Sequence, residues 1–157
     1  AWFYDNRVAV AHIGDSRLYR LRLGRLQRLT RDHSVLQEQL DSGIIAAHQA
    51  WFAPGRGLVT RALGVHPTVE PELGDFEVRR GDLYLLCSDG LNDMIDDDEI
   101  ELLLLESGDD PEQAAALLVQ LANDRGGRDN VSVILVAVRG SFAAREVWWR
   151  RWLPRNG

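Results

Sequence analysis

The fold of this chain is decided by residues 8–23, which read VAVAHIGDSRLYRLRL. On both sides of the Gly-Asp-Ser turn the side chains alternate with a period of two, which is the pattern of a half-buried β-strand. The alternation predicts a hairpin of strands 8–13 and 18–23. Gly24 permits a second tight turn into residues 26–29, so the prediction extends to a meander of three strands.

The rest of the sequence alternates between helical periodicity and apolar runs. Helices are predicted where a capping residue precedes an apolar stripe at helical spacing, and buried strands where an apolar run is short and continuous. The predicted helices cover 34–43, Asp97 or Asp98 to Leu105, and 110–127; the predicted strands cover 83–87 and 131–138, the second of them central in its sheet. Strands layered with helices and joined by hairpins indicate an α+β fold with mainly antiparallel pairing.

The composition is that of a globular domain with an acidic balance. The 157 residues are 45% hydrophobic, and the formal net charge is -6. Such a chain lacks the clustered positive charge that nucleic-acid binding needs, so we expect no nucleic-acid partner. Cys87 is the one cysteine, which indicates a buried thiol and a cytoplasmic location. No apolar run reaches the roughly 18 residues of a membrane helix, and no signal-peptide pattern is present.

Three short acidic turns each adjoin a predicted strand, and they contain Asp15, Asp89 and Asp129. A stiff strand can hold a carboxylate while its oxygens reach a cavity, and hard divalent cations prefer oxygen ligands. Any one of these residues alone is as well explained by a local hydrogen bond to the backbone. Three of them in matching contexts favour a shared metal site.

The other candidate reactive groups have ordinary explanations. A lone histidine beside a strand or turn is more often structural than a metal ligand. That reading is preferred for His12, His33, His48 and His66. Ser16 and Ser88 are weak candidates for a nucleophile, because no histidine is placed in the sequence to act as their base. Residues 44–57 lack sustained periodicity and indicate a long surface excursion, a kind of segment that is often functional.

Five motifs, in order within residues 8–138, resemble the carboxy-terminal part of the metal-dependent type 2C (PPM-type) serine/threonine protein phosphatases of bacteria. They are GDSR at 14–17, LTRDHS at 29–34, TRALG at 60–64, SDGL at 88–91 and DNVS at 129–132. Five motifs in family order are far more specific than any one of them. The resemblance assigns residues 1–139 to the carboxy-terminal portion of such a domain and leaves 140–157 as a basic, Trp-rich tail.

The resemblance implies part of a four-layer αββα sandwich with two mainly antiparallel sheets, the amino-terminal part of the fold being missing, and with Mn²⁺ or Mg²⁺ bound at one edge. It implies two core ions and a possible third. Asp89 would bind one core ion, Asp129 would help to hold the core pair, and Asp15 would serve the third ion. The residues implied beside the metals are Ser88, Gly90 and Asn130, and those implied on the substrate side, in the flap over 44–57, are His48, Trp51 and Arg56.

The implied activity is hydrolysis of phosphoserine and phosphothreonine in proteins by a metal-activated water that attacks phosphorus in line. The family also uses an amino-terminal portion with an Asp-Gly metal motif, which this sequence lacks. We therefore expect the chain to be a fragment that needs that portion and is inactive alone. The alternative is a noncatalytic regulatory or binding module, a pseudophosphatase, which keeps the fold without a complete metal centre.

The tail differs in composition from the rest of the chain. It contains Arg145, Arg150, Arg151 and Arg155 against the single acid Glu146, with Trp148, Trp149 and Trp152 among them. Basic and aromatic side chains together predict contact with an acidic partner or a membrane surface. The alternative is that the Trp rings pack back on the domain or that the segment frays.

Overall fold

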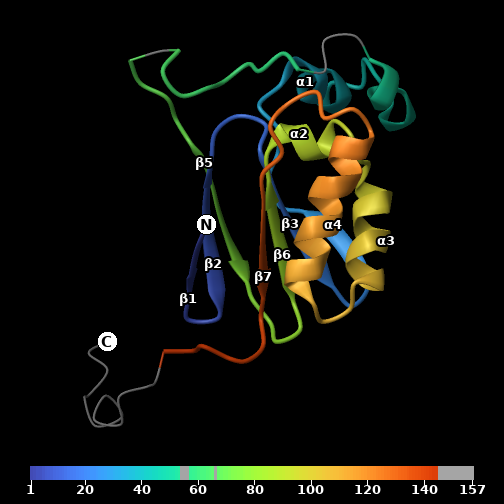
Figure 1. Cartoon of the computed structure of the whole chain (residues 1–157). Helices are drawn as coiled ribbons and strands as arrows, with labels where there is room; N and C mark the ends of the chain where they lie inside the picture. The colour runs from blue at the N-terminus through green and yellow to red at the C-terminus, as the bar shows by residue number, and fades with distance from the viewer. Residues whose placement is uncertain (54–56, 66, 145–157) are drawn as a thin grey trace, which may run out of the picture.

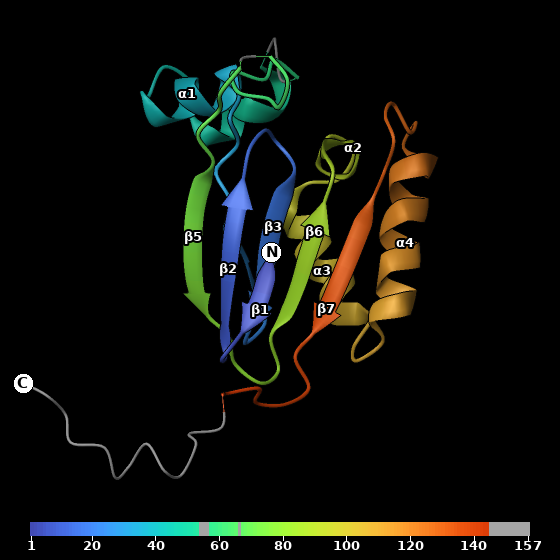
Figure 2. The same ribbon diagram turned by 90° about the vertical axis from the view of Figure 1, so that its left-hand side faces the viewer.

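A computed structural model describes residues 1–53, 57–65 and 67–144, and they form two antiparallel sheets. Sheet A contains β1 (Trp2–Tyr4), β2 (Arg7–His12) and β5 (Glu72–Glu77), in the order β1-β2-β5. Sheet B contains β3 (Arg17–Arg22), β4 (Arg25–Arg28), β6 (Leu83–Cys87) and β7 (Val133–Ala137), in the order β4-β3-β6-β7. The predicted α+β class and antiparallel pairing are therefore confirmed (Figures 1 and 2).

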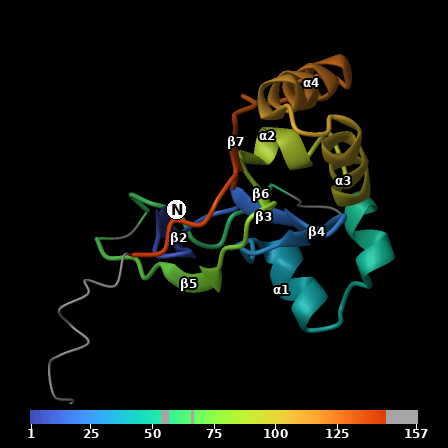
Figure 3. The same ribbon diagram turned by 90° about the horizontal axis from the view of Figure 1, so that it is seen from below.

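The helices lie on one side of sheet B and at one end of the two sheets. They are α1 (Val35–Asp41), the 3₁₀ helix η1 (Ala47–Phe52), α2 (Asp89–Asn92), α3 (Asp97–Glu106) and α4 (Pro111–Asp124). Helices α3 and α4 cover the face of sheet B that points away from sheet A (Figures 1 and 3). The described residues place no helix on the outer face of sheet A (Figure 1). No helix in these residues is both long and apolar enough to cross a membrane.

The predicted hairpin of 8–13 with 18–23 is wrong. Strand β2 pairs with β1 and β5, whereas β3 pairs with β4 and β6, so the Gly-Asp-Ser turn carries the chain from one sheet to the other. Alternation reports which face of a strand is buried, but it does not identify the neighbouring strand. The crossover places Asp15 at the end of the sandwich, between its two sheets.

The second predicted turn is confirmed. Strands β3 and β4 form a hairpin in which Arg22 opposes Arg25 across the two residues Leu23 and Gly24. Both have positive φ, at 50° and 77°, as the favoured two-residue hairpin turn requires.

Strand β6 serves two cores, which explains its continuous apolar sequence. Tyr84 is buried between the two sheets with Val8 and Val10 of β2. The alternate residues Leu85 and Cys87 are buried against the helices. A strand covered on both faces has no side for polar residues.

Strand β7 was predicted to be central, and that prediction is wrong for this chain, because β7 ends sheet B. Its apolar sequence reflects the packing of side chains on its faces. Such a sequence does not require a hydrogen-bonded strand on each edge. Ile134 on β7 is 60% exposed, and Leu73 on β5 and Trp2 on β1 are 74% and 70% exposed. Both sheets therefore leave large apolar side chains in solvent.

The helix starts follow their capping residues. Ser34 caps α1 by accepting a hydrogen bond from the Gln37 amide, and Asp110 caps α4, as predicted. Helix α3 begins at Asp97, one of the two predicted starts, and its cap is Asp96, which forms a capping box with Glu99. Three aspartates in a row offer several equivalent starts, which is why the prediction left two of them open.

The first residues of the predicted tail lie against the β1–β2 turn. The Phe142 amide donates to the Asn6 side chain at 2.8 Å, and the Ala144 amide donates to Asp5 at 2.7 Å. Residues 145–157, on which the predictions for the tail depend, lie outside the described residues.

Candidate metal centre

Asp15 and Asp89 line the same cavity although 74 positions separate them in the sequence. Asp15 lies in the turn between the sheets, and Asp89 is the first residue of α2, directly after β6. The cavity has a volume of about 600 Å³. Its remaining lining residues are Arg17, Arg28, Asp32, Ser34, Leu36, Gln37, Leu40, His48, Ala50, Gly57, Asn92, Asp93, Asp96, Asp97 and Asp98. The two carboxylates predicted to bind metal thus share a cavity with α1 and η1.

The electrostatics of Asp15 favour a cation in this cavity. Burial raises the pKa of Asp15 above its ordinary value, and the negative charge of Asp89 raises it further, with smaller contributions from Asp32 and Asp93. Like charges held together in a partly buried site repel one another. A divalent cation between them would remove that repulsion, and the oxygen donors present are the type that Mn²⁺ and Mg²⁺ prefer.

Asp129 is joined to Asp89 through the backbone of two adjacent loops. The Ser88 hydroxyl donates to the Asn130 carbonyl and accepts from the Ser132 amide, both at 3.0 Å. Gly90 packs so closely that an added Cβ would lie 2.5 Å from the Asn130 carbonyl oxygen. Ser88, Gly90 and Asn130 therefore hold the two acidic loops together, although Asp129 itself is not among the cavity-lining residues in the described part of the chain.

Two of the three aspartates also make the local hydrogen bonds that the simpler explanation predicts. Asp89 accepts from the Gly90 amide at 2.9 Å, and Asp129 accepts from the Asn130 amide at 2.7 Å. Each bond fixes one carboxylate oxygen and leaves the other available. The local bond and a metal-binding role are therefore compatible in this geometry.

The predicted flap residues are only partly described. His48 lies in η1 and lines the same cavity as Asp15 and Asp89. The backbone of Trp51 belongs to η1, but its side chain lies outside what the structure describes, and Arg56 lies entirely outside the described residues.

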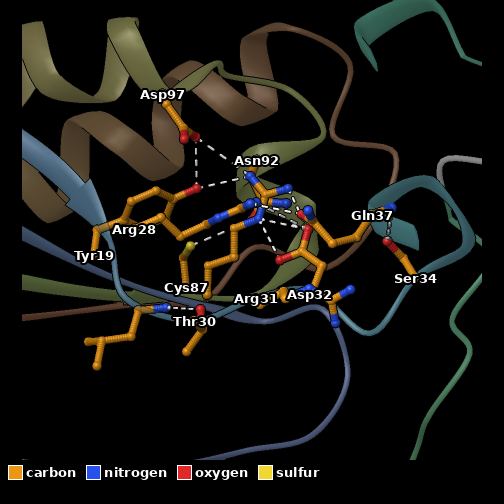
Figure 4. A network of polar contacts seen from close by, with 12 residues as sticks. Tyr19, Arg28, Thr30, Arg31, Asp32, Ser34, Gln37, Cys87, Asn92 and Asp97 are labelled. Carbon is orange, nitrogen blue, oxygen red and sulfur yellow. Dashed lines mark hydrogen bonds and ion pairs between the residues drawn. The ribbon is translucent and has the colours of Figure 1, made fainter. Parts of the chain in front are cut away.

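A partly buried polar network that lines the cavity was not predicted from the sequence. The Arg17 guanidinium donates to Asp32 through Nε at 3.0 Å and through Nη2 at 2.6 Å. Arg17 also donates to the Tyr19 hydroxyl, which donates to Asp97 at the start of α3 at 2.8 Å. Figure 4 shows the contacts around Asp32. The motifs GDSR and LTRDHS contained the signal, but nothing in either motif identified the other as its partner.

A second cluster lies behind the Asp15 turn. His12, His33 and Glu72 offer possible metal-ligand atoms that all lie within 4.8 Å of one another, so by distance alone they form a possible metal triad. His12 and Glu72 are opposed in the register of β2 and β5. The centroids of the His12 and His33 rings lie 5.0 Å apart, with the ring planes tilted by 34°.

Comparison with known proteins identifies relatives. The chain is 45% identical over 138 residues to the serine/threonine protein phosphatase PstP of Mycobacterium tuberculosis, covering 87% of this chain and 26% of PstP. It is 38% identical over 131 residues to the serine/threonine phosphatase stp of Listeria welshimeri, covering 83% of this chain and 52% of that protein. The chain is a homologue of the bacterial PPM-type serine/threonine phosphatases. No protein-family model matches it.

Solved PPM-type structures match the fold as well. The M. tuberculosis PstP/Ppp structure has a TM-score of 0.83 at 42% identity, covering 88% of this chain and 57% of the solved chain. Stp1 from Staphylococcus aureus has a TM-score of 0.83 at 35% identity, covering 88% and 54%. A PstP catalytic domain in complex with two manganese ions matches with a TM-score of 0.76. The chain spans about half the length of these solved PPM-type phosphatases.

Proposed function

We propose that this chain forms the part of a Mn²⁺- or Mg²⁺-dependent protein phosphatase that contains Asp15, Asp89 and Asp129, and that the complete enzyme hydrolyses phosphoserine and phosphothreonine in proteins. The observation that carries the proposal is the meeting of Asp15 and Asp89 in one cavity, with the Asp129 loop bonded to the Asp89 loop. Sequence identity to proteins named as serine/threonine phosphatases supports the same activity.

Each acidic residue has a distinct proposed role. Asp89 would bind a core ion from the start of α2, Asp129 would help to hold the core pair, and Asp15 would hold a third ion from the crossover turn. The bound ions would supply an activated water and neutralise charge on the phosphoryl oxygens. Ser88, Gly90 and Asn130 would keep the Asp89 and Asp129 loops at a fixed separation.

The substrate would enter beside η1. His48 lines the cavity there, and a polar ring in that position can contact a peptide. We propose His48, Trp51 and Arg56 as candidate substrate-contacting residues of the flap. The proposed partner is a phosphorylated protein in the cytoplasm, and the basic tail over 140–157 would contact an acidic partner or a membrane surface.

The proposed enzyme needs more than this chain. The solved relatives are nearly twice as long as the region they share with it, since it covers 57% and 54% of them. The exposed Trp2, Leu73 and Ile134 are apolar surfaces on which a further part of the fold would pack, completing a four-layer αββα sandwich. We therefore propose that residues 1–139 are the carboxy-terminal portion of the phosphatase domain and are inactive alone.

The test is hydrolysis of a phosphothreonine peptide by the complete gene product, with Mn²⁺ and with EDTA. The proposal expects turnover that depends on Mn²⁺, and no turnover from the chain of residues 1–157 alone. A folded gene product without Mn²⁺-dependent turnover would favour the alternative, a noncatalytic regulatory or binding module.

A further inference from the structure

His33 is bonded twice to the residue that precedes Asp15. The His33 amide donates to the Gly14 carbonyl at 2.8 Å, and the Gly14 amide donates to Nδ1 of the His33 ring at 3.1 Å. Gly14 has φ of +103°, a conformation that a glycine leaves easily unless neighbouring groups fix it. Because His33 satisfies both polar groups of this peptide residue, it determines where the turn points.

The bond from Gly14 also fixes the protonation of the His33 ring. A backbone N–H only donates, so Nδ1 must be unprotonated, and a neutral ring then carries its proton on Nε2. Nε2 lies 3.4 Å from the Glu72 carboxylate, which can accept that proton's hydrogen bond. Burial lowers the pKa of His33, the charges of Arg61 and His12 lower it further, and Glu72 opposes them. The ring is therefore held neutral in one tautomer.

The same geometry argues against a metal in the cluster of His12, His33 and Glu72. A metal on Nε2 of His33 would require the ring proton to move to Nδ1, where it would face the N–H of Gly14. In a metal-bound histidine, the ring nitrogen that does not bind the metal carries the proton and donates a hydrogen bond to an acceptor. Arg61 Nη1 also lies 3.4 Å from Nε2 and brings a positive charge to the position a cation would occupy. The close approach of three possible ligand residues does not make this a metal site.

We propose that His33 is a positioning residue, which holds the Gly14–Asp15 turn so that the Asp15 carboxylate faces the cavity. The consequence for catalysis rests on the proposed function. The His33 carbonyl also accepts from the Thr60 amide at 2.8 Å, so the same residue joins the Asp15 turn to the segment that follows the flap. The buried ring of His12 packs against His33 with the two ring planes tilted by 34°.

Replacing His33 by asparagine or by glutamine tests the roles of its two ring nitrogens separately. In His33→Asn the side-chain oxygen lies near the position of Nδ1 and can accept from Gly14. In His33→Gln the amide nitrogen reaches towards the position of Nε2 and can donate to Glu72, but the Gly14 amide loses its partner. A buried donor without a partner is costly, so we expect His33→Gln to lower turnover at limiting Mn²⁺ about tenfold and His33→Asn to recover most of that loss.

A double variant tests whether the effect passes through Asp15. In the complete gene product, His33→Gln combined with Asp15→Asn should be no slower than Asp15→Asn alone, since the turn would have no ligand left to position. An equal further loss in the double variant would overturn the proposal, because it would indicate a general structural role. Equal turnover of the Asn and Gln variants would overturn it as well.

A spectroscopic readout keeps this test independent of activity. Long-range ¹H–¹⁵N spectra of the histidine rings in the complete gene product should show His33 in the Nε2–H tautomer, unchanged by one equivalent of Zn²⁺. An Nδ1–H tautomer, or a shift of His12 and His33 on adding Zn²⁺, would overturn the assignment. If the wild-type protein shows no Mn²⁺-dependent turnover but keeps the Nε2–H tautomer, the proposed function fails while the positioning of the turn stands.

Discussion

The two acidic regions of the candidate centre are held by different means. The Asp89 and Asp129 loops are locked to each other by Ser88 and by the close backbone contact at Gly90. The Asp15 turn is held by His33, whose amide donates to the Gly14 carbonyl and whose ring accepts from the Gly14 amide. Close backbone packing such as that at Gly90 tolerates few changes of shape, whereas the bond to the His33 ring can be changed by a single substitution.

The largest expected effect is at the locked loops. Asp89→Asn or Asp129→Asn keeps the side-chain size and the bond to the following amide, but it removes the charge that a divalent ion needs. We expect Mn²⁺-dependent hydrolysis of a phosphopeptide by the complete gene product to fall by about a hundredfold or more. Circular dichroism should show an unchanged fold. Near-wild-type turnover in both variants would remove the metal roles proposed for these residues.

The contact between the Asp89 and Asp129 loops can be disrupted by a substitution that leaves both carboxylates in place. A methyl group at Gly90 would lie 2.5 Å from the Asn130 carbonyl oxygen and must push the loops apart. We expect Gly90→Ala to reduce the free energy of unfolding by about 1–3 kcal/mol and to weaken Mn²⁺ binding measured by calorimetry. Gly140→Ala is the matched control, since a methyl group there meets nothing within 4 Å. Equal behaviour of the two variants would show that the loops are not held by close packing.

How far the sequence predicts this molecule depends on the range of the interaction. The caps Ser34 and Asp110 and the turn at Leu23 and Gly24 are local, and all were predicted. The pairing of β2 was not, because the same alternation fits a hairpin within one sheet and a crossover between two sheets. Local patterns do not encode which distant strand supplies the partner.

The same distinction between local and long-range interactions applies to the candidate site. Asp15 and Asp89 could be named from their turns, and the structure brings both to one cavity. The pairing of His33 with Gly14 could not be inferred, since it joins residues 19 positions apart and depends on the crossover that the hairpin prediction missed. The bond between Arg17 and Asp32 was missed for the same reason.

Asp15→Asn should be milder than either change in the locked loops. Asp15 serves the proposed third ion, so its loss leaves the core pair in place. We expect turnover at limiting Mn²⁺ to fall about tenfold, with partial recovery at saturating Mn²⁺. Titration of activity with Mn²⁺ measures both values. A loss as large as that of Asp89→Asn, without recovery, would mean that the two regions form one inseparable site.

The smallest expected effect is on the pH dependence of stability, and it concerns the side chain that holds the Asp15 turn. Burial, Arg61 and His12 lower the pKa of His33 in the folded protein below the ordinary value of 6.5. The unfolded chain therefore binds more protons at this residue than the folded chain does, so the contribution is complete above about pH 6.5 and is lost as the pH falls through the folded pKa. Glu72 opposes this shift without reversing it.

Urea unfolding at about pH 7.5 and about pH 5.5 measures this contribution. Wild-type protein should lose more free energy of unfolding between the two values than His33→Asn, which cannot titrate but can still accept from the Gly14 amide. The same loss in both proteins would mean that His33 does not hold the turn as a neutral ring. A steeper loss in wild type alone would locate the acid sensitivity at the Asp15 turn, because the backbone lock between the other two loops contains no histidine.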